Sequence, residues 1–253
     1  MAEGVRVMGR PSRCALMSGL EAVLEAAKRG VEDPDPRRRL AVVRGLSRLE
    51  GASEAERGRA VELLGRLVTD EAAYVRWNVA LALGQLGDSR GLPHLGTLAA
   101  DEHANVRLRV ALAVGLIGDP DGVDILAGLS GDSYQIGEAF PVRAYAALSL
   151  GLLGEPKGLA ALATLAGDDN GEVRWHATVA LGDLSHEQGV EALIARTEDE
   201  IPFVRAHAAI GLSEIGSPKG LDAVERLATS DPAERVKKIA GKALSALGEK
   251  LAQ

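Results

Sequence analysis

A dipeptide that returns at nearly constant spacing constrains this chain more than any other feature. Valine followed by arginine occurs at Val75, Val106, Val142, Val173 and Val204, and Val236 continues the series with a lysine, at spacings of 31, 36, 31, 31 and 32 residues. Glycine or serine recurs nine and twelve positions after each valine, and glycine recurs sixteen positions after the first five. A repeat of this length predicts an array of similar supersecondary units.

Each unit is predicted to contain two helices. The first should begin at an aspartate five residues before the valine, which suits an N-cap, and should stop at a glycine. A shorter second helix follows, as in the helical spacing of Leu159, Leu162 and Leu165. Neither helix can bury its apolar side alone, so successive pairs must stack into an α-solenoid. The aspartates are Asp70, Asp101, Asp168, Asp199 and Asp231.

We therefore predict an all-α, single-domain solenoid of about seven repeats. In the first repeat, Arg38 and Arg39 take the Val-Arg register and Asp33 takes the cap position. The 36-residue spacing marks an insertion at 130–141, and a loop lengthened in one repeat is often functional. The expected parts are an N-terminal capping helix (1–31), repeats at 32–69, 70–100, 101–136, 137–167, 168–198 and 199–230, and a C-terminal capping repeat (231–253).

Composition limits the classes of function. A net charge of −7 argues against a dedicated nucleic-acid binder, although residues 1–50 hold ten Lys and Arg against seven Asp and Glu. No apolar run approaches the roughly 18 residues that a membrane span needs, and the single cysteine, Cys14, excludes an internal disulfide framework. We expect a soluble, cytoplasmic monomer with no membrane, nucleic-acid or cofactor partner.

The quoted pattern also resembles a known family. "D....VR..AA.ALG.LGD..G...L..L" is similar to the HEAT-like repeat of the phycobilin lyase type, over roughly residues 33–253. The resemblance implies a right-handed superhelix in which the Val-Arg helices line the concave face. In that family the concave face usually binds another macromolecule.

The aromatic residues gather on one face of the Val-Arg helices. At 100° per residue, positions −1, +2, +3, +6 and +10 from each valine point away from the packed valine side. Residues at these positions vary widely in size and polarity, which favours a binding surface, while packing between curved repeats is the structural alternative. The aromatic candidates are Tyr74, Trp77, Tyr145, Trp175 and Phe203, with Phe140 at the edge of the face and Tyr134 in the insertion.

Polar residues on the same face are candidates for selecting a partner. They are Asn78, Arg109, His176, Asp183, His207 and Glu214. His176 and His207 share a register, but the deoxyhypusine hydroxylases, a metal-binding HEAT-like family, use repeated His-Glu pairs on inner helices. Here the one such pair, His186-Glu187, falls between helices, so we predict no metal site.

No catalytic motif appears in the sequence. There is no P-loop, no dinucleotide-binding glycine pattern and no nucleophile elbow. The arginines of the Val-Arg pairs recur with the aspartates and predict an ion-pair network between neighbouring repeats. We predict a non-enzymatic scaffold that binds a protein or peptide in an aromatic-lined concave groove, with a bilin-handling, lyase-like subunit or chromophore chaperone as the alternative.

Overall fold

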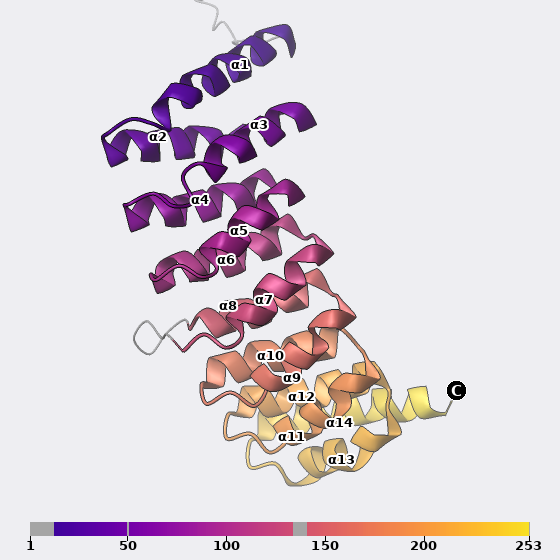
Figure 1. Cartoon of the computed structure of the whole chain (residues 1–253). Helices are drawn as coiled ribbons and strands as arrows, with labels where there is room; N and C mark the ends of the chain where they lie inside the picture. The colour runs from indigo at the N-terminus through magenta and orange to yellow at the C-terminus, as the bar shows by residue number, and fades with distance from the viewer. Residues whose placement is uncertain (1–12, 50, 134–140, 253) are drawn as a thin grey trace, which may run out of the picture.

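In the computed structural model the chain is a stack of helix pairs, running from α1 at one end to α13 and α14 at the other (Figure 1). The structure describes residues 13–49, 51–133 and 141–252. Within these ranges every regular element is a helix, as the repeat predicted.

The Val-Arg helices alternate along the chain with a second set of helices, which from α5 onward are shorter and follow a 3₁₀ turn. The Val-Arg helices are α2 (Pro36–Leu46), α4 (Ala73–Leu86), α6 (Ala104–Ile117), α8 (Val142–Leu153), α10 (Gly171–Asp183), α12 (Pro202–Ile215) and α14 (Glu234–Leu251). The others are α1 (Arg13–Gly30), α3 (Glu54–Gly65), η1 (Ser89–Gly91) with α5 (Leu92–Leu98), η2 (Pro120–Gly122) with α7 (Val123–Leu129), η3 (Pro156–Gly158) with α9 (Leu159–Leu165), η4 (Glu187–Gly189) with α11 (Val190–Arg196), and η5 (Pro218–Gly220) with α13 (Leu221–Ser230).

The glycine twelve positions after the valine ends the Val-Arg helix in four repeats, as predicted, whereas Gly248 lies inside α14. Gly87 adopts φ +62°, a left-handed conformation that L-residues with a side chain adopt at a cost. Gly118, Gly154 and Gly216 do the same, but in α10 the position is taken by Ser185 at φ +48°. The second helix then packs its leucines into the core: Leu159, Leu162 and Leu165 are all buried.

The glycine nine positions after the valine lets neighbouring Val-Arg helices approach closely. A Cβ atom added to Gly84 in α4 would lie 2.7 Å from the Cα atom of Ala113 in α6. The same close approach recurs between α10 and α12, where a Cβ atom on Gly182 would lie 2.9 Å from the Cα atom of Gly211. Small residues at this position therefore set the distance between repeats.

A ladder of buried ion pairs joins each repeat to the next, which confirms the predicted network. Arg174 donates from Nε and Nη2 to the two carboxylate oxygens of Asp199, at 2.7 and 3.0 Å. Its Nη1 donates to the carbonyl oxygens of Asp168 and Asp169 in the turn before its own helix. Such bidentate, charge-assisted pairs are strong and geometrically specific. The six rungs are Arg39–Asp70, Arg76–Asp101, Arg107–Asp132, Arg143–Asp168, Arg174–Asp199 and Arg205–Asp231.

The predicted N-cap role of these aspartates is wrong. Helix α4 is preceded by the N-cap Ala72, and Asp70 lies two residues earlier, where its carboxylate accepts the Ala72 amide at 2.9 Å. Asp101, Asp168, Asp199 and Asp231 make the same turn, and in the first repeat Asp35 is the N-cap while Asp33 accepts the Asp35 amide. The carboxylates stand outside the helix start because they must also reach the arginine of the preceding repeat.

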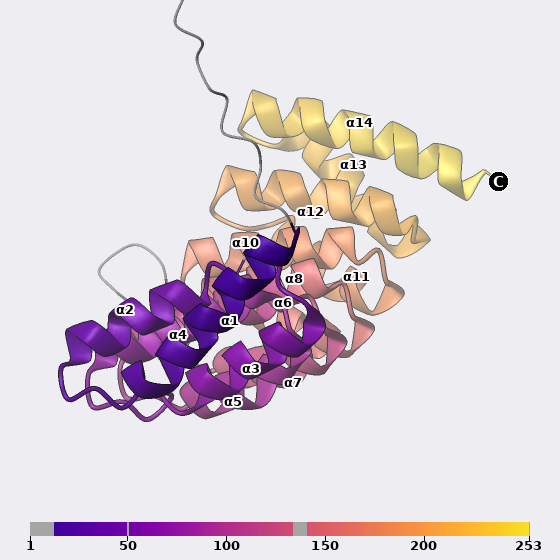
Figure 2. The same cartoon turned by 90° about the horizontal axis from the view of Figure 1, so that it is seen from above.

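The two layers differ in how closely their helices pack. Each Val-Arg helix contacts the Val-Arg helix of the next repeat extensively, whereas from α3 onward successive second helices barely touch one another. Figure 2 shows the two layers in the first half of the stack, with α2 and α4 on one side and α3, α5 and α7 on the other. In a curved stack of helices, the layer whose helices pack more closely lies on the inner side of the curve. The Val-Arg helices therefore line the inner side of the solenoid.

Candidate functional site

The candidate site is the surface of the Val-Arg helices that points away from the second helices. We call it the inner face and define it by positions −1, +3, +6 and +10 from each register valine. The six valines themselves are at most 2% exposed, whereas the +10 side chain is exposed in every repeat from α4 to α14. These +10 residues are Gln85, Leu116, Leu152, Asp183, Glu214 and Ala246.

Large apolar side chains reach water mainly along these helices. Leu152 is 67% exposed, Leu116 58% and Phe203 55%, so more than half of each residue lies outside the core. Ile210 at position +6 is also exposed. Among the described residues only two further large apolar side chains, Val23 in α1 and Leu251 in α14, are exposed to a similar degree away from this face and its edge.

The two tryptophans lie at the edge of the inner face. Trp77 is 36% and Trp175 38% exposed, so about two thirds of each is covered by neighbouring residues. Position +2 is buried where the residue is Leu108, Ala144 or Ala206, which shows that this position borders the packed side. Each tryptophan thus packs against neighbouring residues with part of its side chain and exposes the rest, so both alternatives from the sequence, packing between repeats and a binding surface, remain compatible with its position.

The remaining predicted aromatic residues differ from one another. Tyr74 and Tyr145 are half-buried and pack against the core, so they serve the fold as well as the surface. Phe203 is exposed, and the guanidinium carbon of Arg235 lies 5.4 Å from the centre of its ring, within reach of a cation–π interaction. Phe140 and Tyr134 lie outside the residues that the structure describes.

A cluster of rings connects α10 to α12. The ring centres of Trp175 and His176 are 4.7 Å apart, and His207 meets Trp175 edge-on at 6.1 Å. The Nδ1 atom of His207 lies 2.7 Å from the carbonyl oxygen of Phe203 and must carry a proton to donate to it, so neutral His207 presents Nε2 as an acceptor. Burial lowers the pKa of His176, although the nearby Glu172 acts in the opposite direction, so His176 is neutral at pH 7.

The polar candidates are spread along the inner face rather than gathered at one point. Asn78 donates its amide to the carbonyl oxygen of Tyr74 at 2.6 Å, which leaves its own oxygen for a ligand. Arg109, Asp183 and Glu214 are exposed, and Glu214 pairs with Lys250 at 3.6 Å. In the described part of the chain, no three His, Cys, Asp or Glu side chains lie close enough together to hold a metal ion.

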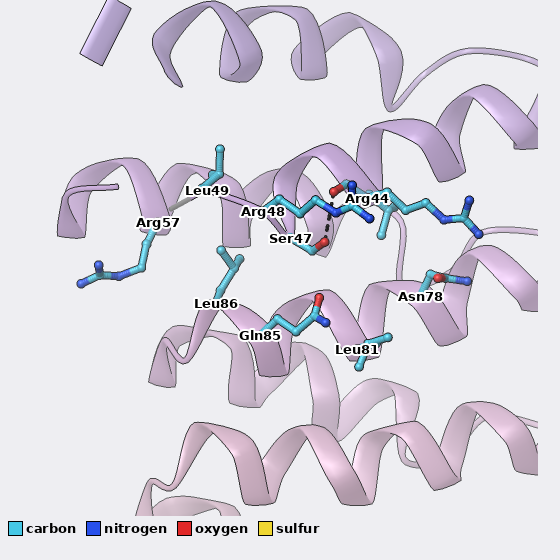
Figure 3. Close-up of a pocket in the computed structure, with 10 residues that line it drawn as sticks. Arg44, Ser47, Arg48, Leu49, Arg57, Asn78, Leu81, Gln85 and Leu86 are labelled. Carbon is cyan, nitrogen blue, oxygen red and sulfur yellow. Dashed lines mark hydrogen bonds between the residues drawn. The ribbon is translucent and has the colours of Figure 1, made fainter. Parts of the chain in front are cut away.

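Sequence reasoning missed a hollow between α2 and α4. It measures about 600 Å³ and is lined on one side by Arg44, Ser47 and Arg48 and on the other by Asn78, Leu81 and Gln85, with Arg57 at one end (Figure 3). Arg44 and Arg48 occupy positions +6 and +10 of the first repeat, so the inner face continues into this hollow. The register that placed Asp183 and Glu214 at position +10 also places Arg48, Leu116 and Leu152 there, and this is the signal in the sequence that could have identified them.

The comparisons with known proteins identify the family. The sequence matches HEAT repeats over residues 60–140, 92–180, 137–200 and 163–245, which together make up most of the chain. The chain therefore belongs to the HEAT-repeat family, and the resemblance to the HEAT-like repeats of phycobilin lyases is confirmed. No curated protein matches the sequence. None of the described helices is long and apolar enough to cross a bilayer.

Solved structures with low sequence identity share the fold. The E. coli protein YIBA is 17% identical, with a TM-score of 0.63 over 92% of this chain and 85% of that one. An engineered protein is 20% identical, with a TM-score of 0.61 over 91% and 68%. The complex of CpcE and CpcF of phycocyanin lyase from Nostoc sp. PCC7120 is 18% identical, with a TM-score of 0.53 over 100% and 97%. At these identities the likeness concerns the fold alone.

Proposed function

We propose that this HEAT-repeat protein is a non-enzymatic scaffold that binds an extended segment of a protein partner along its inner face. The observation that carries the proposal is the exposure of Leu116 and Leu152 in adjacent repeats, followed along the stack by Trp175 and Phe203. Exposed apolar side chains that gather on one face of neighbouring helices add nothing to the fold while they face water, and such groups usually mark binding surfaces. The polar candidates Asn78, Arg109, His176, Asp183, His207 and Glu214 would then select among partners.

The repeat geometry sets the length of the segment. Packed helices lie about 8–10 Å apart, and an extended peptide advances about 3.3 Å per residue, so one repeat corresponds to about three peptide residues. A segment that contacts α6, α8, α10 and α12 therefore needs about ten residues, with apolar side chains at every third position. Because the inner face is formed by stacked helices and does not depend on binding for its structure, docking requires little ordering of the protein.

The likeness to phycocyanin lyase supports the fold and not a bilin-handling role. No specific contact of the described residues favours that alternative, since the histidines make contacts with Trp175 and with the Phe203 backbone, and Arg109 lies two Val-Arg helices away in α6. We therefore propose the binding role and not the bilin-handling role.

Selection from a random 16-residue peptide library on purified protein tests the proposal. The selected peptides should bind wild type and lose roughly 30-fold or more in affinity for Leu116→Ser/Leu152→Ser, because two leucines that become buried on binding contribute about 1–2 kcal/mol each. Val23→Ser/Leu251→Ser is the matched control, since it removes two equally apolar exposed side chains away from the inner face. Failure to select any peptide, or equal binding by both double variants, would refute the proposal.

A further inference from the structure

The hollow between α2 and α4 exists because α2 is short. Helix α2 ends at Leu46, eight positions after its register residue Arg38, whereas α4 continues to Leu86, eleven positions after Val75. The last turn of α4 therefore has no helical neighbour on the α2 side. The gap opens onto the inner face, and Figure 3 shows the side chains of Arg44 and Arg48 above it and those of Asn78 and Gln85 below.

The arginines of this hollow differ from those of the ladder. Arg39, on the same helix, is held by the carboxylate of Asp70 at 2.5 and 2.9 Å. Arg44 and Arg48 are exposed, and no carboxylate in the described part of the chain forms an ion pair with either. A second, shallower hollow on the other side of the same two arginines is bordered by Arg37, which is also exposed. Among the described residues that line either hollow, none is acidic.

The amides complete a site for an anionic group. Gln85 faces the arginines from α4 and can donate hydrogen bonds, and Asn78 has one amide hydrogen besides the one that it donates to Tyr74, while Leu81 and Leu86 provide an apolar floor. A guanidinium fork binds a carboxylate or phosphate through two parallel hydrogen bonds, and two arginines one helical turn apart can bind the same group or two successive ones. In a protein of net charge −7, such a local positive site opposes the overall field.

We infer that this hollow binds an acidic stretch of the polypeptide partner, an inference that rests on the proposed function. A nucleic acid fits less well, because its binding draws on a series of basic side chains facing successive phosphates, whereas position +10 beyond α4 holds Leu116 and Leu152 and then Asp183 and Glu214. A polypeptide can carry acidic residues at one end and apolar residues along the rest, which matches the order of side chains from α2 to α12.

The distance between neighbouring repeats sets the spacing between the acidic and the apolar residues of the partner segment. The hollow lies about one and a half repeats from α6, or roughly 15 Å, which an extended peptide covers in four to five residues. The partner segment should therefore carry its acidic group four to five residues from the apolar residue that contacts Leu116. This predicts a segment of about 16 to 18 residues in total.

Designed peptides test the inference by fluorescence anisotropy. The probe is an 18-residue peptide that consists of four glutamates, a four-residue Gly-Ser spacer and a segment with apolar residues at every third position. It is made in two versions, one with the glutamates at the N-terminus and one with them at the C-terminus. Companion peptides carry lysines or phosphoserines in place of the glutamates. We expect wild type to bind one of the two glutamate orders, to bind the phosphoserine version at least as well, and to bind the lysine version at least tenfold more weakly.

Variants assign the binding to the hollow. Arg44→Gln/Arg48→Gln should weaken the glutamate peptide at least tenfold and reduce the salt dependence of its affinity, while Arg44→Lys/Arg48→Lys should restore part of it. The matched control is Lys219→Gln/Arg226→Gln, which removes the same charge from exposed residues of the outer layer. Circular dichroism verifies that each variant is folded.

The outcomes separate the inference from the proposed function. If the Arg44/Arg48 variant and the control bind the glutamate peptide equally, while Leu116→Ser/Leu152→Ser loses it, the inference is wrong and the scaffold function stands. Equal binding of the lysine and glutamate peptides, or tighter binding of a 12-nucleotide single-stranded DNA, also overturns the inference. If no peptide binds wild type, the proposed function fails as well.

Discussion

Two neighbouring aspartates that contact the same arginine allow a sharp test of the ion-pair ladder. Asp168 and Asp169 both accept hydrogen bonds from Arg143, Asp168 at 2.6 and 2.8 Å and Asp169 at 2.9 Å. The side chain of Asp168 is 9% exposed and that of Asp169 82%. Burial alone would raise the pKa of Asp168, but hydrogen bonds from Arg143 and from the Asn170 amide outweigh it, and the pKa is lowered.

The change Asp168→Asn should lower the free energy of unfolding by about 3 kcal/mol. The amide keeps one acceptor oxygen but places a donor against the Nε–H of Arg143, so one charge-assisted hydrogen bond is lost, and such a bond is worth about 1.5–3 kcal/mol. The guanidinium, 11% exposed, then keeps only the exposed Asp169 as a charged partner, and breaking a buried pair costs about 3–5 kcal/mol. Asp169→Asn should change stability by less than about 0.5 kcal/mol, as for other exposed pairs.

Urea unfolding followed by tryptophan fluorescence measures both the size and the place of the effect. Arg143 and Asp168 join α8 to α10, and this interface lies between Trp77 in α4 and Trp175 in α10. In Trp77→Phe and Trp175→Phe backgrounds the remaining tryptophan reports on one half of the stack. Because contacts in a solenoid are local, Asp168→Asn should separate the two midpoints. Equal effects of the two aspartate changes, or a loss below about 1 kcal/mol for Asp168→Asn, would show that the ladder does not couple the repeats.

Further predictions concern single positions and pH. Ser185→Gly should raise the free energy of unfolding by about 1 kcal/mol, measured in urea, because serine at φ +48° is strained where four other repeats have glycine. Ser149→Ala should be neutral or stabilising, and a loss above about 1 kcal/mol would contradict the finding that this buried hydroxyl has no hydrogen-bond partner among the described residues. Gly84→Ala should destabilise by about 1–3 kcal/mol because its Cβ atom would meet the Ala113 backbone, whereas Gly96→Ala should not, because its Cβ atom would make only an ordinary contact with Ile125 at 3.9 Å. The pKa values of five ladder aspartates, Asp70, Asp101, Asp168, Asp199 and Asp231, are lowered in the folded state, so their stabilisation is complete above the unfolded pKa of about 4 and is lost as the pH falls below it. Urea midpoints at pH 7, 5, 3.5 and 2.5 should show the steep loss only in the last two steps.

Most of the fold could be predicted because the information is local and repeated. The spacing of Val-Arg pairs fixes the unit, the glycine after each helix fixes its end, and apolar spacing such as that of Leu159, Leu162 and Leu165 fixes the second helix. The N-cap assignment failed because the position of an aspartate such as Asp70 depends on Arg39 in the preceding repeat, a partner 31 residues away. Local cap preference cannot show that a carboxylate is already engaged.

The candidate site was harder to predict because exposure depends on packing between repeats. The register placed Trp77 and Tyr74 on one face, yet it could not show that Trp77 is two thirds covered or that Tyr74 packs against the core. Leucine is a residue type that is usually buried. Leu116 and Leu152 are exposed because no neighbouring element covers position +10 in the described part of the chain. The hollow beside Arg44 depends on where α2 ends, which no glycine at the usual position marks in the sequence.

The structure separates the residues that hold the repeats together from those that face a partner. The ladder arginines and aspartates, and the glycines at the helix contacts, all lie off the inner face, and they recur with little change from repeat to repeat. At position +10 the inner face instead changes from Arg48 after α2 to leucine in α6 and α8 and to acidic residues in α10 and α12. Because these exposed side chains contribute little to packing, their identities are free to follow the requirements of binding. A stripe with one charge sign at its first end and apolar side chains along its middle is therefore better explained by the order of residues in a bound segment than by the stability of the stack.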